Sequence, residues 1–81
     1  MTLEIITPEK TLYQSEDAHS VICPGIDGTF QLLNNHSALV SALKKGNVTV
    51  SDHQNKSISF AIQSGIVECS KNKVNILVEE A

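Results

Sequence analysis

The sequence predicts an all-β fold, a single β-sandwich domain over residues 1–81 with about eight to ten short strands. Apolar residues alternate with polar ones along most of the chain, which is the spacing of half-buried strands. Turn-forming residues recur roughly every eight to twelve positions. No internal repeat, low-complexity run or linker divides the chain, so one domain is expected.

Four segments carry the clearest strand signal, at residues 3–5, 47–51, 57–63 and 73–79. In each, every second side chain is apolar and is expected to point into the core. The inward set is Leu3, Ile5, Val48, Val50, Ile58, Phe60, Ile62, Val74, Ile76 and Val78. The sharpest turn signal between strands is Asp27-Gly28, because glycine tolerates the positive φ of a tight hairpin.

Residues 35–46 resemble a helix when only local propensity is considered. Asn35 is a good N-cap, Leu39 and Leu43 are four residues apart, and Gly46 suits the position after a helix end. This segment therefore conflicts with the all-β prediction.

Charge and composition exclude several classes of partner. The formal net charge is −3, and the six basic residues are all lysines that form no stripe. A nucleic-acid surface is therefore not expected. No apolar run approaches the roughly 18 residues of a membrane span, so we expect membrane contact only through another protein.

The sequence predicts no metal site, cofactor site or catalytic centre. His19, His36 and His53 are far apart in the chain, without metal-ligand spacing, and scattered surface histidines are expected. There is no nucleophile elbow and no phosphate loop. Cys23 and Cys69 are expected to be buried free thiols, and the alternative is one bridge if the chain is exported.

The stretch from Phe30 to Leu43 is more apolar than one sheet face requires. Two interpretations are open. It exposes an apolar loop around Leu39 that binds another protein, or its side chains plug one end of the sandwich. In the first case, replacing Leu39 with Asp should prevent assembly and leave the fold intact.

The same stretch carries a resemblance to the epsilon subunit of the F-type ATP synthase. Residues 24–28 (PGIDG) and 35–40 (NHSALV) follow the family's glycine-bounded hairpin and histidine loop. Residues 60–68 (FAIQSGIVE), 72–79 (NKVNILVE) and 3–13 (LEIITPEKTLY) are similar to its other motifs. The resemblance therefore covers essentially the whole chain, in the family's order.

This resemblance implies a ten-stranded β-sandwich of two sheets, in which residues 35–46 form loop and strand. It implies a non-catalytic central-stalk (rotor) subunit that links the gamma subunit to the c-ring and couples proton flow to ATP synthesis. The expected place is peripheral, at the cytoplasmic face of a bacterial inner membrane. The positions that correspond to contacts with the c-ring or gamma are Thr29, Phe30, His36, Ser37, Ala38 and Leu39.

Two departures from the family pattern modify this expectation. Ala38 stands where the family usually has proline, so the fixed φ of proline is lost from the loop. The sequence ends at Ala81, so the inhibitory C-terminal helical hairpin of longer members is not expected in this chain. The alternative function is a free-standing sandwich that binds a small molecule or glycan, which would require exposed aromatic side chains.

Overall fold

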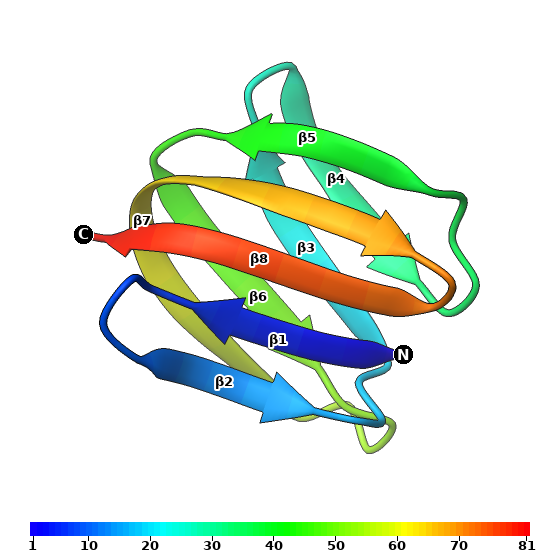
Figure 1. Ribbon diagram of the computed structural model, residues 1–81. Coiled ribbons are helices and arrows are strands. Elements are labelled where there is room, and N and C mark those ends of the chain that lie inside the picture. The colour runs from blue at the N-terminus through cyan, green and yellow to red at the C-terminus, as the bar shows by residue number, and fades with distance from the viewer.

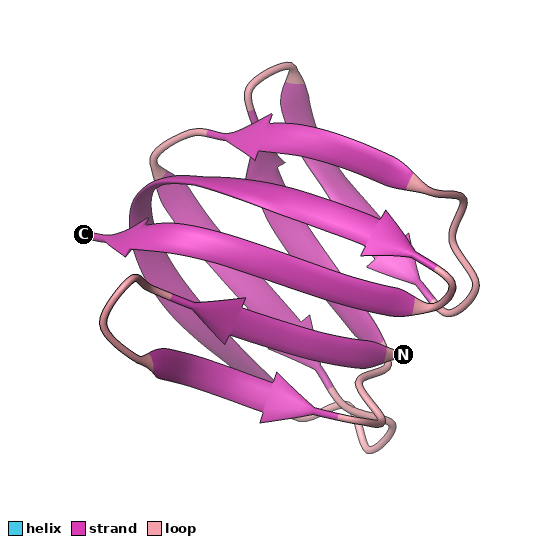
Figure 2. Cartoon of the chain, in the orientation of Figure 1, coloured by secondary structure: helices cyan, strands magenta, loops and turns pink.

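A computed structural model describes residues 1–81 as an all-strand protein without helices (Figures 1 and 2). The strands are β1 (Thr2–Ile6), β2 (Thr11–Ser15), β3 (Ser20–Gly25), β4 (Gly28–Leu33), β5 (Leu39–Leu43), β6 (Gly46–Ser51), β7 (Ser57–Ser70) and β8 (Lys73–Glu80). The predicted fold class is confirmed.

The strands form two layers. In Figure 1 the nearer layer, here the front sheet, contains β2, β1, β8, the C-terminal half of β7 and β5. The back sheet contains β4, β3, β6 and the N-terminal half of β7. All neighbouring strands are antiparallel except β1 and β8, which run parallel. Hydrogen bonds link all the strands, so the sandwich is one sheet folded onto itself.

Strand β7 joins the two layers. Its first half pairs with β6 up to Ile62, and its second half pairs with β5 from Gly65 onward. Between them, the pairing with β8 shifts register at Ile62/Ser64, a bulge that lets a strand bend. A side chain at Gly65 would place its Cβ 2.9 Å from the carbonyl oxygen of Leu77. The structure has eight strands where the resemblance implied ten, in part because β7 runs continuously through both sheets.

The predicted alternation is confirmed for most of the core. The inward-facing side chains of β1, β6 and β8 are all buried. The prediction is wrong for Ile58, which is 49% exposed. It is the second residue of β7, next to the exposed turn at residues 52–56, so it lies at the rim of the sandwich. Phe60 is half-buried and packs against the core edge-to-face with Tyr13, at 5.9 Å between ring centroids.

Two tight hairpins set the register of their strands. Gly25 pairs with Gly28 across the β3–β4 turn, and Gly28 has a φ of +131°, as the Asp27-Gly28 signal predicted. In the β7–β8 turn, Lys71 and Asn72 have φ values of 53° and 59°. Two successive positive values match the twist of a two-residue hairpin.

Residues 35–46 do not form a helix. Leu39–Leu43 is strand β5, which pairs antiparallel with β7 from Leu39↔Cys69 to Leu43↔Gly65. This pairing satisfies the backbone of β5 and buries Leu43. Cross-strand pairing therefore outweighs the local helix signals.

Both cysteines are buried free thiols, as predicted. Burial raises the pKa of Cys23 to about 12 and also raises the pKa of Cys69. The thiolate is the reactive form of cysteine, so neither side chain is suited to act as a nucleophile in the folded chain.

The pKa of Cys23 makes stability depend on pH. An unfolded cysteine ionises near pH 8.5, whereas folded Cys23 stays neutral until about pH 12. The un-ionised thiol makes its full contribution to the free energy of unfolding below the pKa of the unfolded chain. As the pH rises above that value, this contribution falls by about 1.4 kcal/mol per pH unit. Urea unfolding between pH 8 and pH 11 should show a steeper loss of stability for the parent than for Cys23→Ala. If the free energy of unfolding fell equally steeply with pH in both proteins, the burial of an un-ionised thiol at Cys23 would be contradicted.

Candidate functional site

The residues predicted to contact partners lie in two separate groups. Thr29 and Phe30 are at the start of β4, beside the hairpin tip at residues 25–28. His36 to Leu39 follow the other end of β4, in the loop that leads into β5. Four residues of strand separate Thr29 from the end of β4, about 13 Å. The structure therefore places the two groups at opposite ends of one strand.

Hydrogen bonds from neighbouring turns hold the loop at residues 34–38. Asn35 has a φ of 62°, and its backbone N–H donates to Oδ1 of Asn72 at 2.8 Å. The N–H of His36 donates to the carbonyl of Leu33 at 3.2 Å. The thiol of Cys69 approaches the carbonyl oxygen of His36 at 4.0 Å. The loop without proline is thus tied to both β4 and the β7–β8 hairpin.

The side chains of this group differ in exposure. His36, Ser37 and Ala38 are exposed, whereas Leu39 is half-buried and packs against the core. The exposed large apolar side chain of β5 is Val40, which is 70% exposed. The segment therefore plugs the core with Leu39 and presents Val40 outward.

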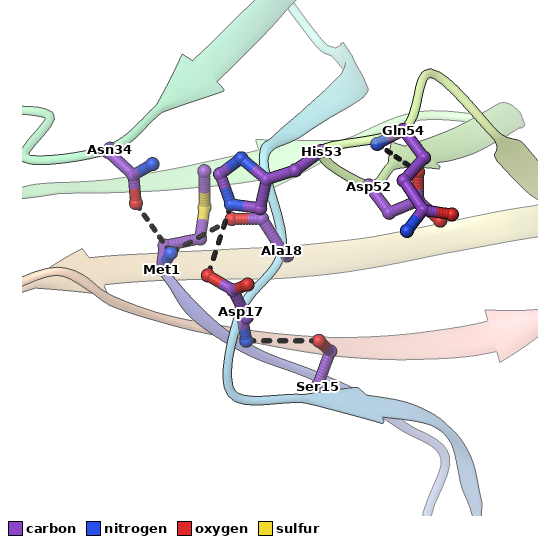
Figure 3. Close-up of polar contacts among 8 residues, drawn as sticks. All are labelled: Met1, Ser15, Asp17, Ala18, Asn34, Asp52, His53 and Gln54. Atoms are coloured by element: carbon purple, nitrogen blue, oxygen red, sulfur yellow. Dashed lines mark hydrogen bonds and ion pairs between the residues drawn. The ribbon is translucent and has the colours of Figure 1, made fainter.

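A polar cluster occupies the end of the sandwich where β2 leads into β3 and β6 into β7 (Figure 3). The carboxylate of Asp17 accepts from Nε2 of His53 at 3.0 Å. The ring of His19 lies 5.0 Å from that of His53, centroid to centroid. The histidines are therefore not all scattered as predicted, because pairing of β3 with β6 brings two of them together.

Backbone amides define the turn beside this cluster. Asp52 accepts from the N–H of Gln54 and of Lys56, at 2.8 and 3.0 Å. These two bonds lower the pKa of the Asp52 carboxyl. No group of three or more His, Cys, Asp or Glu side chains in the structure is arranged to hold a metal ion. The cluster fastens a turn to a loop.

The outer face of the front sheet carries a row of apolar side chains that sequence reasoning missed. Ile66 of β7 lies between Ala42 of β5 and Leu77 of β8, and Leu77 is also opposite Ile6 of β1. Ile66 is 50% and Leu77 46% exposed. The row crosses four strands, about 14 Å at the usual spacing between strands. We call Ile6, Leu77, Ile66 and Ala42 the apolar row.

A signal for the apolar row was present in the sequence. Ile66-Val67 and Ile76-Leu77-Val78 are consecutive apolar residues, which a strand must divide between its two faces. Val67, Ile76 and Val78 are buried, so their neighbours point outward. The break in alternation therefore marks an apolar outer face.

The outer face of the back sheet is different. Its strand residues carry no charge and are mostly polar, with Thr49 and Ser59 joined through their hydroxyl oxygens at 2.9 Å. The exposed large apolar side chains of this face are Ile22 in its middle, at 36%, and Leu33 at the end of β4, at 48%. The two outer faces of the sandwich thus differ in chemistry, and only the front one has an apolar row.

The surface offers little to a small ligand. The three depressions are open to solvent, and the one beside the apolar row, of about 330 Å³, is lined by Pro8, Gly65, Ile66 and Leu77 among others. All three aromatic residues, Tyr13, Phe30 and Phe60, are half-buried against the core. None forms the exposed stacking platform that the glycan-binding alternative requires. The structure contains no helix that could cross a bilayer.

The different positions of Leu39 and Val40 can be tested by a pair of substitutions. Leu39→Asp should lower the free energy of unfolding by several kcal/mol, about 2–5, because it places a charge against the core. Val40→Asp should change it by less than about 1 kcal/mol, since that side chain is exposed. Urea denaturation followed by circular dichroism measures both. A stable Leu39→Asp protein would show that Leu39 is outside the core.

The sequence of this chain is similar to those of ATP synthase epsilon chains. The family profile described as "ATP synthase, Delta/Epsilon chain, beta-sandwich domain" matches residues 1–81. The chain is 44% identical to the ATP synthase epsilon chain of Chlorobium limicola over 78 residues, covering 96% of this chain and 88% of that one. It is 36% identical to the epsilon chain of Brevibacillus brevis over 81 residues, covering all of this chain and 61% of that one.

Solved structures agree with the fold. A chain in the mitochondrial ATP synthase of Euglena gracilis superimposes with a TM-score of 0.90 at 19% identity, covering 96% of this chain and 49% of that one. A chain in the central stalk/c-ring structure of Tetrahymena thermophila mitochondrial ATP synthase gives 0.82 at 20% identity, covering 99% and 63%. The profile match over the whole sequence and the identity to epsilon chains establish that this chain belongs to the delta/epsilon family of ATP synthase subunits.

Proposed function

We propose that this chain is a non-catalytic central-stalk (rotor) subunit of the F-type ATP synthase, in which it links the gamma subunit to the c-ring. The observation that carries the proposal is the exposed apolar row across the front sheet of a protein of this family. To couple proton flow to ATP synthesis, such a subunit must transmit torque. That task requires a stable contact surface and no reactive group.

We assign the gamma contact to the outer face of the front sheet. The molecule measures 27 × 22 × 20 Å, and a standard interface, which buries ~800 Å² of each partner, would therefore take up most of one side of it. Ile66 and Leu77 lie in the middle strands of this face, where side chains are most completely desolvated by a partner.

The residues that the sequence singled out fit two further contacts. Thr29 and Phe30 lie beside the hairpin tip at residues 25–28, and His36, Ser37, Ala38 and Leu39 lie at the opposite end of β4. One partner surface reaches both groups only if it extends along the whole strand. We therefore infer that His36 to Leu39, which lead into β5 of the front sheet, extend the gamma contact, and that Thr29 and Phe30, on β4 of the back sheet, contact the c-ring.

Assembly explains how a single domain of 81 residues is stabilised. A chain of this size buries only about 60–65% of its unfolded surface. A partner that binds only the folded state stabilises it by mass action. In this proposal residues 1–81 are one domain, held peripherally at the cytoplasmic face of a bacterial inner membrane by the complex.

Replacing one residue of the apolar row tests the proposal. Ile66→Asp should abolish co-purification of gamma from the same organism with the tagged chain, because it places a charge in the middle of the interface. Circular dichroism should remain that of the parent, since Ile66 is half exposed in the free chain.

The matched control is Ile22→Asp, an exposed isoleucine on the outer face of the back sheet. That variant should retain gamma. If the parent chain brings down no gamma at all, the proposed function is wrong. If both variants retain gamma, the gamma contact has been assigned to the wrong face of the sandwich.

A further inference from the structure

Carboxylates border the apolar row on both sides. Glu68 is two residues beyond Ile66 on β7, and Glu79 is two residues beyond Leu77 on β8. Both point outward, because Val67 and Val78 beside them are buried. Ile66 and Leu77 are directly opposite each other, so the two carboxylates lie on opposite sides of the pair.

A third outward carboxylate, Glu4, lies on the same side of the apolar row as Glu68. Glu68 is opposite Asn75 of β8, which is opposite Glu4 of β1. The same register places Val40 at the other end of this line. The apolar row thus has Glu4 and Glu68 along one side and Glu79 on the other.

None of these three carboxylates is paired within the chain. The ion pairs of the structure are Lys10–Glu80 and His53–Asp17. Lys73 is the cation among the outward strand residues of the front sheet. It lies opposite Thr2 and Ser70, two residues from the pairs that contain Glu4 and Glu68 and further from the apolar row. The face is therefore apolar in its centre and negative at its borders.

This arrangement disfavours two of the three occupants that could cover the apolar row. A second copy would bring a face with three carboxylates and one lysine against its equal, and like charges that face each other across an interface disfavour association. An anionic lipid surface would meet the same negative border. A protein with basic side chains on both sides of an apolar strip would neutralise it.

We propose that the front face selects its partner by charge as well as by apolar contact, and that the partner surface is an apolar strip bordered by lysine or arginine. This rests on the proposed function and describes the gamma surface that the chain would recognise. Charges at the rim of an interface act mainly on the association rate and its salt dependence. The apolar row then supplies the lasting contact.

Charge removal without loss of volume tests the inference. The variant Glu68→Gln/Glu79→Gln removes one carboxylate from each border and leaves Glu4, and Glu16→Gln/Asp27→Asn makes the same change in net charge away from the apolar row and its borders. Association of each full chain with purified gamma is followed by surface plasmon resonance from about 50 to 500 mM salt, a range over which exposed charges become screened.

We expect the Glu68/Glu79 variant to associate about tenfold more slowly than the parent at low salt and to lose most of its salt dependence. The Glu16/Asp27 control should behave as the parent. If gamma binds the parent but all three proteins show the same rate and salt slope, charge selection is overturned and the proposed function stands. If gamma binds none of them, the proposed function fails and the inference fails with it.

The other occupants give distinct results. A parent chain that sediments as a dimer, and becomes monomeric on Ile66→Asp, would overturn the inference in favour of a second copy. Binding of the parent to vesicles of anionic phospholipid, lost in the same variant, would overturn it in favour of a membrane surface.

Discussion

The register of strand β7 is the constraint on which the rest of the structure depends. Its N-terminal half pairs with β6 in the back sheet and its C-terminal half with β5 and β8 in the front sheet. A slip of one residue exchanges the two faces of a strand. It would expose Val67 and bury Ile66 and Glu68, so both the core and the apolar row follow from one set of hydrogen bonds.

The tight hairpins and the bend of β7 protect this register. The β7–β8 turn is a two-residue turn with both φ values positive, which leaves little freedom in how the strands align. At the bend, the bulge near Ser64 absorbs the change of direction. Gly65 then lets the backbone of β8 approach within a distance that a larger residue would not allow. Small local features therefore hold a long strand in a single alignment.

The core and the two outer faces of the sandwich differ in chemistry. The core uses buried aliphatic side chains and two un-ionised thiols, and the polar cluster of Asp17, His19 and His53 ties a loop to a turn. The front face presents an apolar row that is partly exposed to water in the isolated chain. In the proposed function, a partner covers this row and removes it from water. The back face, which is mostly polar and uncharged, has no such row.

The sequence by itself determined the all-β class, the alternating core of β1, β6 and β8, the Gly28 hairpin, the buried thiols and the family. Each of these depends on periodicity, turn chemistry or motifs that neighbours in the chain carry together. The family resemblance already implied a strand within residues 35–46, and the structure confirms it, whereas only the tertiary structure decided that Ile58 is exposed and that His19 meets His53. The tertiary structure also decided that Thr29 and His36 lie at opposite ends of β4, and that Ile66, Leu77, Ile6 and Ala42 form one row. These features arise from pairing between strands that are far apart in sequence, and only the register of those pairs places one side chain beside another.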